Sequence, residues 1–281
     1  MWVRLPLPEH DSQVPKVWAT EHRWSVELPM RDGEVVTQVI PIISDIQYPL
    51  HDRKAVDVVA TFVADLGVPT VCIGDELDQT EISRWVRGSK LEYLGGLEKA
   101  RDEIGPLLAA LGVEHLTRSN HGNSRLESYL KNVPAIADFP ELRYENFIGL
   151  DKYGITFHRQ PYKVAPGWVA VHGDEGGMSQ AAGGTALLHA KKWGKSVVCG
   201  HTHKLGLQHG HQGHSGRVLR ELWGFEVGNL MDMTKASYLK GGYGNWQQGI
   251  GVLVVDGKRV TPVPVPIRNG VLHFDGKRYK A

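Results

Sequence analysis

Cysteine is scarce in the sequence, which contains only Cys72 and Cys199 among its 281 residues. Neither has a partner at the spacing that zinc-thiolate or redox sites require, so cysteine chemistry of those kinds is excluded. Each cysteine ends a short β-branched run that leads into a glycine. Because free cysteine behaves as a small hydrophobic residue, we expect both thiols to be reduced and buried.

The sequence also lacks long apolar runs and an excess of one charge. No segment approaches the roughly 18 apolar residues that a membrane span needs, and the N-terminal stretch Met-Trp-Val-Arg-Leu-Pro does not form a signal-peptide core. We therefore expect a cytoplasmic protein without membrane contact. Lys and Arg total 32 against 31 Asp and Glu. This balance does not indicate a broad nucleic-acid-binding surface, although it leaves local binding to nucleic acid open.

Short apolar runs alternate with helical patterns, as is typical of layered α/β proteins. The chain is 41% hydrophobic and 22% charged, which is enough apolar material for a full core. Buried strands are predicted at residues 39–43, 70–73, 168–171 and 196–199, with a weaker one at 114–117. Residues 52–66 carry apolar side chains with a 3.6-residue period and therefore predict an amphipathic helix, with Asp52 as N-cap and Gly67 at its end.

Other segments give weaker or different signals. Helical character continues over residues 91–111, where glycine and proline should interrupt or kink it, and recurs over 179–193. Residues 251–255 and 271–274 each precede an Asp-Gly turn, so they predict β-hairpins. The proline-rich stretch 261–266 should be an edge strand or a connector, because proline cannot donate to a central ladder.

Polar side chains follow the predicted strands at the point where each strand ends. These segments are Ser44-Asp45-Ile46-Gln47, Gly74-Asp75-Glu76-Leu77-Asp78, Ser119-Asn120-His121, His172-Gly173-Asp174 and Gly200-His201-Thr202-His203. In open α/β sheets the ligand crevice lies beyond the carboxyl ends of the strands, so these segments can converge on one site. Their carboxylate, amide and imidazole groups form an oxygen and nitrogen shell that suits Mn²⁺, Fe²⁺ or Zn²⁺ better than Ca²⁺.

This ordered set resembles the signature of the calcineurin-like metallophosphoesterases, which reads Asp-x-His, Gly-Asp-x-x-Asp, Gly-Asn-His-Glu, a lone His and Gly-His-x-His. The resemblance covers about residues 40–205, and the strings Ser-Asp-Ile-Gln and Gly-Asp-Glu-Leu-Asp are similar to those of phage-encoded members. It implies an α/β fold with four αββα layers, in which a β-sandwich is flanked by helices, and a β-rich C-terminal portion. We expect one domain over residues 1–281, with the motif core at about 37–205 and β-rich N-terminal and C-terminal segments that complete the sandwich.

The resemblance also implies a dinuclear metal centre built from the polar segments. Its ligands would be Asp45, Gln47 and His203 for the first ion, and Asn120, His172 and His201 for the second. Asp75 would bridge the two ions. Mn²⁺ is the most expected metal, with Fe²⁺, Zn²⁺, Ni²⁺ and Mg²⁺ as alternatives.

Three further residues are expected to support the metals or the substrate. The resemblance implies that His121 contacts the substrate as a proton donor or as a stabiliser of the transition state. Asp78 is expected to orient a ligand histidine. Arg125 is a candidate for contact with a phosphate oxygen through its planar guanidinium, and exposure on a helix face is the equal alternative.

The sequence departs from the family at two of these motifs. Gln47 stands where the family has histidine, and its uncharged amide oxygen is a poorer ligand, so the first site should be weaker. His51 is a candidate to assist that site, although a loop or N-terminal helix position is the stronger expectation. Ser119 and Gly122 replace the glycine and glutamate around Asn-His, and Glu76 is the candidate to supply the missing carboxylate.

Two stretches beyond the motifs leave alternatives open. His209, His211 and His214 lie in a Gly-His-rich stretch that is either a flexible turn or a wall over the metals. Trp246 is expected to be buried in the packing of the C-terminal sheet, with stacking on a base as the alternative.

The resemblance implies hydrolysis of a phosphoester, with Asp75 and His121 as catalytic residues. A metal-bridged water would attack phosphorus, and His121 would assist the leaving group. A phosphodiesterase or nuclease that acts on DNA, RNA or a nucleotide is the preferred interpretation. A phosphomonoesterase or protein phosphatase is the second, and a non-catalytic metal-binding module is the third. The sequence does not indicate an oligomeric state.

Overall fold

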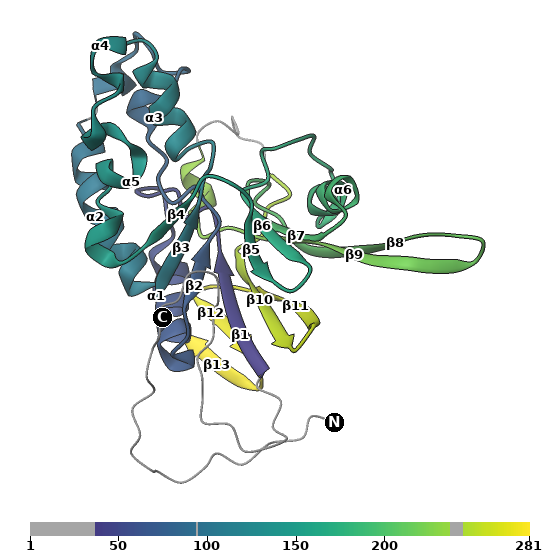
Figure 1. Cartoon of the computed structure of the whole chain (residues 1–281). Helices are drawn as coiled ribbons and strands as arrows, with labels where there is room; N and C mark the ends of the chain where they lie inside the picture. Colours follow the sequence, from purple (N-terminus) through teal and green to yellow (C-terminus); the bar gives the residue numbers. More distant parts are fainter. Residues whose placement is uncertain (1–36, 94, 237–243) are drawn as a thin grey trace.

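The computed structural model describes residues 37–93, 95–236 and 244–281 (Figure 1). The predicted N-terminal β-rich segment falls within residues 1–36 and lies outside the described residues. One mixed sheet has six strands in the spatial order β11 (Arg259–Pro266), β10 (Gly249–Asp256), β1 (Thr37–Ile43), β2 (Thr70–Cys72), β3 (Val113–Thr117) and β4 (Thr156–His158). The other has five, in the order β5 (Tyr162–Ala165), β6 (Trp168–Val171), β7 (Ser196–Cys199), β9 (Arg217–Val227) and β8 (Leu205–His214).

Helices cover the outer face of each sheet. They are α1 (Arg53–Leu66), α2 (Leu97–Ala110), α3 (Asn123–Leu130), α4 (Pro134–Ala137), α5 (Tyr144–Phe147) and α6 (Gly184–Trp193). The first five lie beside the six-stranded sheet, and α6 lies on the five-stranded sheet (Figure 1). A small hairpin of β12 (Val271–Phe274) and β13 (Lys277–Lys280) packs on α1, where Phe62 makes edge contacts with Phe274 and Tyr279.

The two sheets face each other across an apolar layer. Ile42 and Ile73 come from the six-stranded sheet, Val198 and Phe225 come from the five-stranded sheet, and all four side chains are fully buried. A second cluster lies between the six-stranded sheet and α1 and α2, and a third lies beneath α6. This αββα layering confirms the predicted α/β sandwich flanked by helices. Cys72 and Cys199 are free and buried, as expected.

Local signals explain where the elements begin and end. The Asp52 side chain accepts hydrogen bonds from the backbone N–H groups of Lys54 at 2.9 Å and Ala55 at 3.3 Å, so it caps α1 as predicted. Gly67 ends the helix in the left-handed conformation, with φ of 61°. The helical signal over 91–111 resolves into α2 only from Leu97, after a glycine pair.

The C-terminal strands complete the six-stranded sheet on the side away from β2. β10 runs antiparallel to β1, and β11 follows as the outermost strand, which confirms the edge position expected for its prolines.

The Gly-His-rich stretch is neither a turn nor a wall over the metals. Its histidines belong to β8, which pairs with β9 in a long ribbon that extends from the sandwich (Figure 1).

The topology brings the polar segments to one edge of the sandwich. β1, β2 and β3 are parallel to one another, and so are β6 and β7, so the segments that follow these strands leave from their carboxyl ends. Within the described ranges, no helix combines the length and the apolar character that crossing a membrane would require.

Candidate metal centre

The segments after the strands adopt an unusual backbone. Left-handed φ values occur at five predicted ligands, Asp45 (53°), Gln47 (49°), Asp75 (52°), His201 (64°) and His203 (58°). Non-glycine residues rarely adopt this conformation, and it persists only where surrounding contacts impose it. Such contacts are present, because Gln47 N donates to Asp75 O at 2.8 Å and His201 N donates to Asp45 Oδ2 at 2.9 Å.

Two glycines permit the close approach of these segments. At Gly200, an added Cβ would overlap Ser44 Oγ and crowd Asp45 Oδ2. At Gly74, whose φ is 92°, it would overlap the Ser119 side chain. Glycine is therefore required at position 74, before Asp75, and at position 200, before His201, because any side chain there would push the segments apart.

Asp45, Gln47 and His203 form the first group of candidate ligands. The His203 Nε2 atom lies 3.1 Å from Asp45 Oδ1 and 3.1 Å from the Gln47 side-chain nitrogen. All three residues are almost fully buried, and apart from the contact with His203 neither Asp45 Oδ1 nor Gln47 Oε1 has a hydrogen-bond partner. A half-turn of the Gln47 amide would place its oxygen beside the other two acceptor atoms. Such a convergence of unsatisfied acceptors fits a cation.

Asp75, Asn120, His172 and His201 form the second group. His172 Nε2 lies 3.2 Å from Asp75 Oδ2 and 2.7 Å from Asn120 Oδ1. With its Nδ1–H donated to Ile73 O at 3.0 Å, the imidazole is oriented so that Nε2 faces these two oxygens. The His201 ring stands at 64° to His172, and ligand atoms of Asp75 and both histidines lie within 4.8 Å of one another.

The charges in this centre favour a cation between the groups. Burial would lower the pKa of His172, but the Asp75 carboxylate, together with the charges of Asp45 and Asp174, raises that pKa to about 10. Burial would raise the pKa of Asp75, but the charge of His172 holds it well below its usual range. Burial would raise the pKa of Asp45, but attraction to His203, its hydrogen bond to that ring and attraction to His172 together lower it. The positive charge of protonated His172 therefore stabilises the neighbouring carboxylates, as a metal cation in this position would.

His121 belongs to a chain of contacts beside the second group. Its backbone N–H donates to Asp75 Oδ1 at 2.9 Å, and its ring Nδ1 lies 3.1 Å from Asp78 Oδ1. Asp78 therefore orients His121, although the sequence predicted that it would orient a metal ligand. Burial would raise the pKa of Asp78, but the hydrogen bond with His121 lowers it. Because the Asp78 carboxylate takes up Nδ1, Nε2 is the ring nitrogen of His121 that a substrate can meet.

Arg125 is not exposed on a helix face. Its guanidinium donates to the Asp78 carbonyl and lies 3.8 Å from Asp78 Oδ1, and its side chain is only 15% exposed. The exposed helix-face alternative is therefore wrong, and the described contacts direct Arg125 at Asp78. His51 stacks on Tyr48, with ring centroids 5.0 Å apart.

Sequence reasoning gave no role to Ser119 or Tyr144, which shape the centre together with the predicted Glu76. Ser119 Oγ accepts hydrogen bonds from Asp75 N at 2.9 Å and Gly122 N at 3.1 Å. The Glu76 carboxylate accepts from the Tyr144 hydroxyl, and burial raises its pKa to about 7. An added Cβ at Gly122 would lie 3.3 Å from Glu76 Oε1, so Glu76 occupies the space where the family carries glutamate. Ser119 was recognised only as a departure, because no local pattern marks a serine as an acceptor for distant N–H groups.

Two other contacts border the site. The Arg118 guanidinium forms a bidentate pair with Asp174 at 2.7 and 2.8 Å and contacts Glu175 at 3.1 Å. Trp246 is half-buried against the His203 ring, with centroids 4.5 Å apart, rather than buried in the C-terminal sheet. Because these partners lie far apart in the chain, periodicity could not have paired them.

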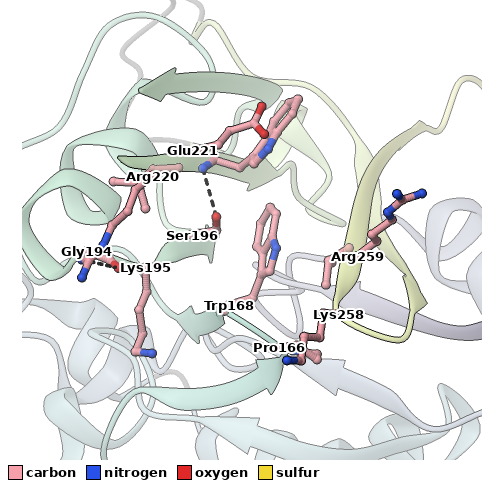
Figure 2. Close-up of a pocket in the computed structure, with 13 residues that line it drawn as sticks. Pro166, Trp168, Gly194, Lys195, Ser196, Arg220, Glu221, Lys258 and Arg259 are labelled. Atoms are coloured by element: carbon pink, nitrogen blue, oxygen red, sulfur yellow. Dashed lines mark hydrogen bonds between the residues drawn. The ribbon is translucent and has the colours of Figure 1, made fainter. Parts of the chain in front are cut away.

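A separate cavity of about 420 Å³ lies at the opposite ends of β6 and β7 (Figure 2). Trp168 and Ser196, which begin those strands, line it, whereas the metal ligands follow the strands' last residues. Lys195, Arg220 and Lys258 are also among the lining residues. The cavity is therefore basic and forms no part of the metal centre.

Comparison with known proteins identifies relatives in phages. No family model matches the chain. It is 37% identical over 247 residues to the Gene 54 protein of Mycobacterium phage D29, covering 84% of this chain and 96% of that protein. The Gene 54 protein of Mycobacterium phage L5 is 34% identical over 248 residues, with 85% and 97% covered. These relatives agree with the phage resemblance of the motifs.

Solved structures show weaker similarity. Vps29 from Cryptosporidium parvum has a TM-score of 0.41 and 13% identity, covering 87% of this chain and 96% of that one. Vps29 from Entamoeba histolytica, complexed with zinc, has 0.39 and 11%, with 86% and 96% covered. A predicted phosphoesterase from Streptococcus pneumoniae has 0.38 and 11%, with 82% and 89% covered. On its sequence relatives, the chain belongs to the family of the mycobacteriophage Gene 54 proteins.

Proposed function

We propose that this protein is a dinuclear-metal-dependent phosphoester hydrolase that acts on phosphodiesters of DNA, RNA or nucleotides. The observation that carries the proposal is the convergence of buried acceptor atoms in the first group, where Gln47 Oε1 has no hydrogen-bond partner and Asp45 Oδ1 has only the His203 ring beside it at 3.1 Å. Buried acceptors of this kind are costly unless a cation satisfies them. The mixed oxygen and nitrogen set fits Mn²⁺, Fe²⁺ or Zn²⁺.

Each group of residues would have a distinct task. Asp45, Gln47 and His203 would hold one ion, Asn120, His172 and His201 would hold the other, and Asp75 would bridge the two. When bound, two divalent ions would neutralise phosphate oxygens and lower the pKa of an attacking water.

His121 would act on the leaving group. Asp78 lies 3.1 Å from the His121 Nδ1 atom, which favours the tautomer and the ring orientation that present Nε2 to a substrate. In its imidazolium form, with a proton on each ring nitrogen, His121 would give the Nε2 proton to the departing oxygen. Arg125 donates a hydrogen bond to the Asp78 carbonyl, so it would help to hold Asp78 in position against His121.

Chelation tests the proposal directly. Purified protein should hydrolyse bis-p-nitrophenyl phosphate, lose that activity in EDTA and regain it with Mn²⁺. Asp75→Asn should remove both metal and activity, whereas Asp57→Asn, on the exposed face of α1, should change neither. Full activity after chelation, with elemental analysis proving that metal is absent, would refute metal-dependent hydrolysis.

Substrate class requires a parallel assay of a monoester, a diester, linear DNA and RNA. Preference for the monoester would favour the phosphomonoesterase alternative. Metal binding without turnover of any of these would favour a non-catalytic module.

A further inference from the structure

A second group of potential metal ligands lies on the ribbon formed by β8 and β9. In the antiparallel register of these strands, His211 is opposite Glu221, and His209 is opposite Trp223. Residues two apart on a strand, and residues directly opposite across a pair, share one face of a sheet. His209, His211 and Glu221 therefore project from the same side of the ribbon.

The three side chains are close enough to share an ion. His209 Nδ1 lies 3.9 Å from Glu221 Oε1, and the rings of His209 and His211 have centroids 5.7 Å apart. Taking one ligand atom from each residue, all three atoms lie within 4.8 Å of one another. Small rotations about the side-chain torsions would bring them to the metal–ligand distances of about 2.0–2.2 Å found for imidazole and carboxylate ligands.

The surrounding contacts hold the ribbon and one of the rings in place. Trp223 packs on His209 with ring centroids 4.8 Å apart and an interplanar angle of 31°. The opposite face of the ribbon is tied to α6, where Gln212 donates to Lys191 O at 3.4 Å. A backbone that is already positioned loses less entropy when a metal binds.

We propose that His209, His211 and Glu221 bind one divalent transition-metal ion, separate from the dinuclear centre. Two imidazoles and one carboxylate suit Zn²⁺, Ni²⁺ or Cu²⁺ rather than Mg²⁺ or Ca²⁺. The side chains of His209 and Glu221 are 51% and 52% exposed, so the remaining coordination positions face solvent and take water or an added ligand. β8 carries His209 ~13 Å beyond Leu205 at the usual rise per residue, away from the segment that bears His203.

Zinc stoichiometry tests this site. Apoprotein would be titrated with Zn²⁺ against a chromophoric chelator, using wild type, His209→Ala/His211→Ala and the matched control His214→Ala. His214 lies on the same strand but outside the cluster. The double variant should lose one bound equivalent relative to wild type, and His214→Ala should lose none. Equal stoichiometry in wild type and the double variant would overturn the proposal, as would the same loss in His214→Ala.

Tryptophan fluorescence gives a second readout that does not depend on the histidine variants. Cu²⁺ bound at this site should quench Trp223, so Trp223→Phe should remove part of the Cu²⁺-dependent quenching, and Glu221→Gln should shift it to higher Cu²⁺ concentration. Unchanged quenching in both variants would count against the site. Because these residues lie outside the dinuclear centre, diester hydrolysis by each variant should equal that of wild type, so this proposal and the proposed function can fail independently.

Discussion

At the scale of single residues, Gln47 is the point where the chain departs most clearly from the metallophosphoesterase motifs. Its side-chain nitrogen lies 3.1 Å from His203 Nε2, and its oxygen has no hydrogen-bond partner. Gln47→His should tighten the first metal site, because imidazole binds Mn²⁺ or Zn²⁺ better than an amide does. Gln47→Ala should weaken it, and both variants should leave the second site nearly unchanged.

Calorimetric metal titration, with anomalous scattering to assign each ion to its site, would measure these effects. If wild type and Gln47→Ala bind the first ion equally well, Gln47 is not a ligand and the family correspondence fails at this position.

His121 and Asp75 are adjacent but should respond differently to substitution. His121→Ala should keep its metal and lower kcat by about 10²–10⁴-fold, because it removes a proton donor. Asp75→Asn should lose metal, because it removes a buried charge from between the two groups. Elemental analysis of both variants beside steady-state kinetics would separate the roles. Loss of metal from His121→Ala would show that the histidine is itself a ligand.

At the scale of elements, α1 depends on a cap that also reaches the sheet. Asp52 Oδ1 caps the helix, while Asp52 Oδ2 accepts a hydrogen bond from Gln248 at 2.9 Å. Asp52→Ala should reduce the free energy of unfolding by about 1 kcal/mol or somewhat more, since it removes the cap together with this second bond. Asp57→Ala, on the exposed face of the same helix, is the control. Equal urea midpoints for the two variants would argue against the cap.

At the scale of the whole molecule, His115, His158 and Tyr162 join the two sheets at one edge. Tyr162 of β5 stacks on His158 of β4 and contacts His115 of β3, with centroids 4.3 and 4.6 Å apart. Burial lowers the pKa of His115 to about 3 and also lowers that of His158. As the pH falls below the ordinary histidine pKa of ~6.5, these two histidines bind protons in the unfolded chain but stay neutral in the folded chain. The free energy of unfolding therefore decreases in this range.

His115→Gln should therefore lose less stability than wild type between pH 7 and pH 5. Urea unfolding at pH 7 and at pH 5 would measure this loss of stability. His273→Gln, at an exposed position, is the matched control. An equal loss in wild type and His115→Gln would show that His115 does not contribute to the acid sensitivity.

Much of the fold was predictable because its signals are local. The apolar period and the Asp52 cap predict α1, and short β-branched runs predict the strands on which the motif residues follow. The order of these motifs was also sufficient to nominate the candidate ligands. The prediction for the Gly-His-rich stretch was wrong. Its alternating glycines and histidines suggest a turn, whereas pairing with β9 makes it a strand.

Sequence alone determined which chemical groups are available, because carboxylate, amide and imidazole at strand ends follow from residue identity. Only the tertiary structure decided which of them meet. The Asp78 contact with His121, the hydrogen bond from Asp75 N to Ser119 Oγ and the Trp246 ring against His203 each join segments distant in the chain. Such contacts depend on how two sheets pack and on how closely their loops approach, and neither leaves a periodic trace in the sequence.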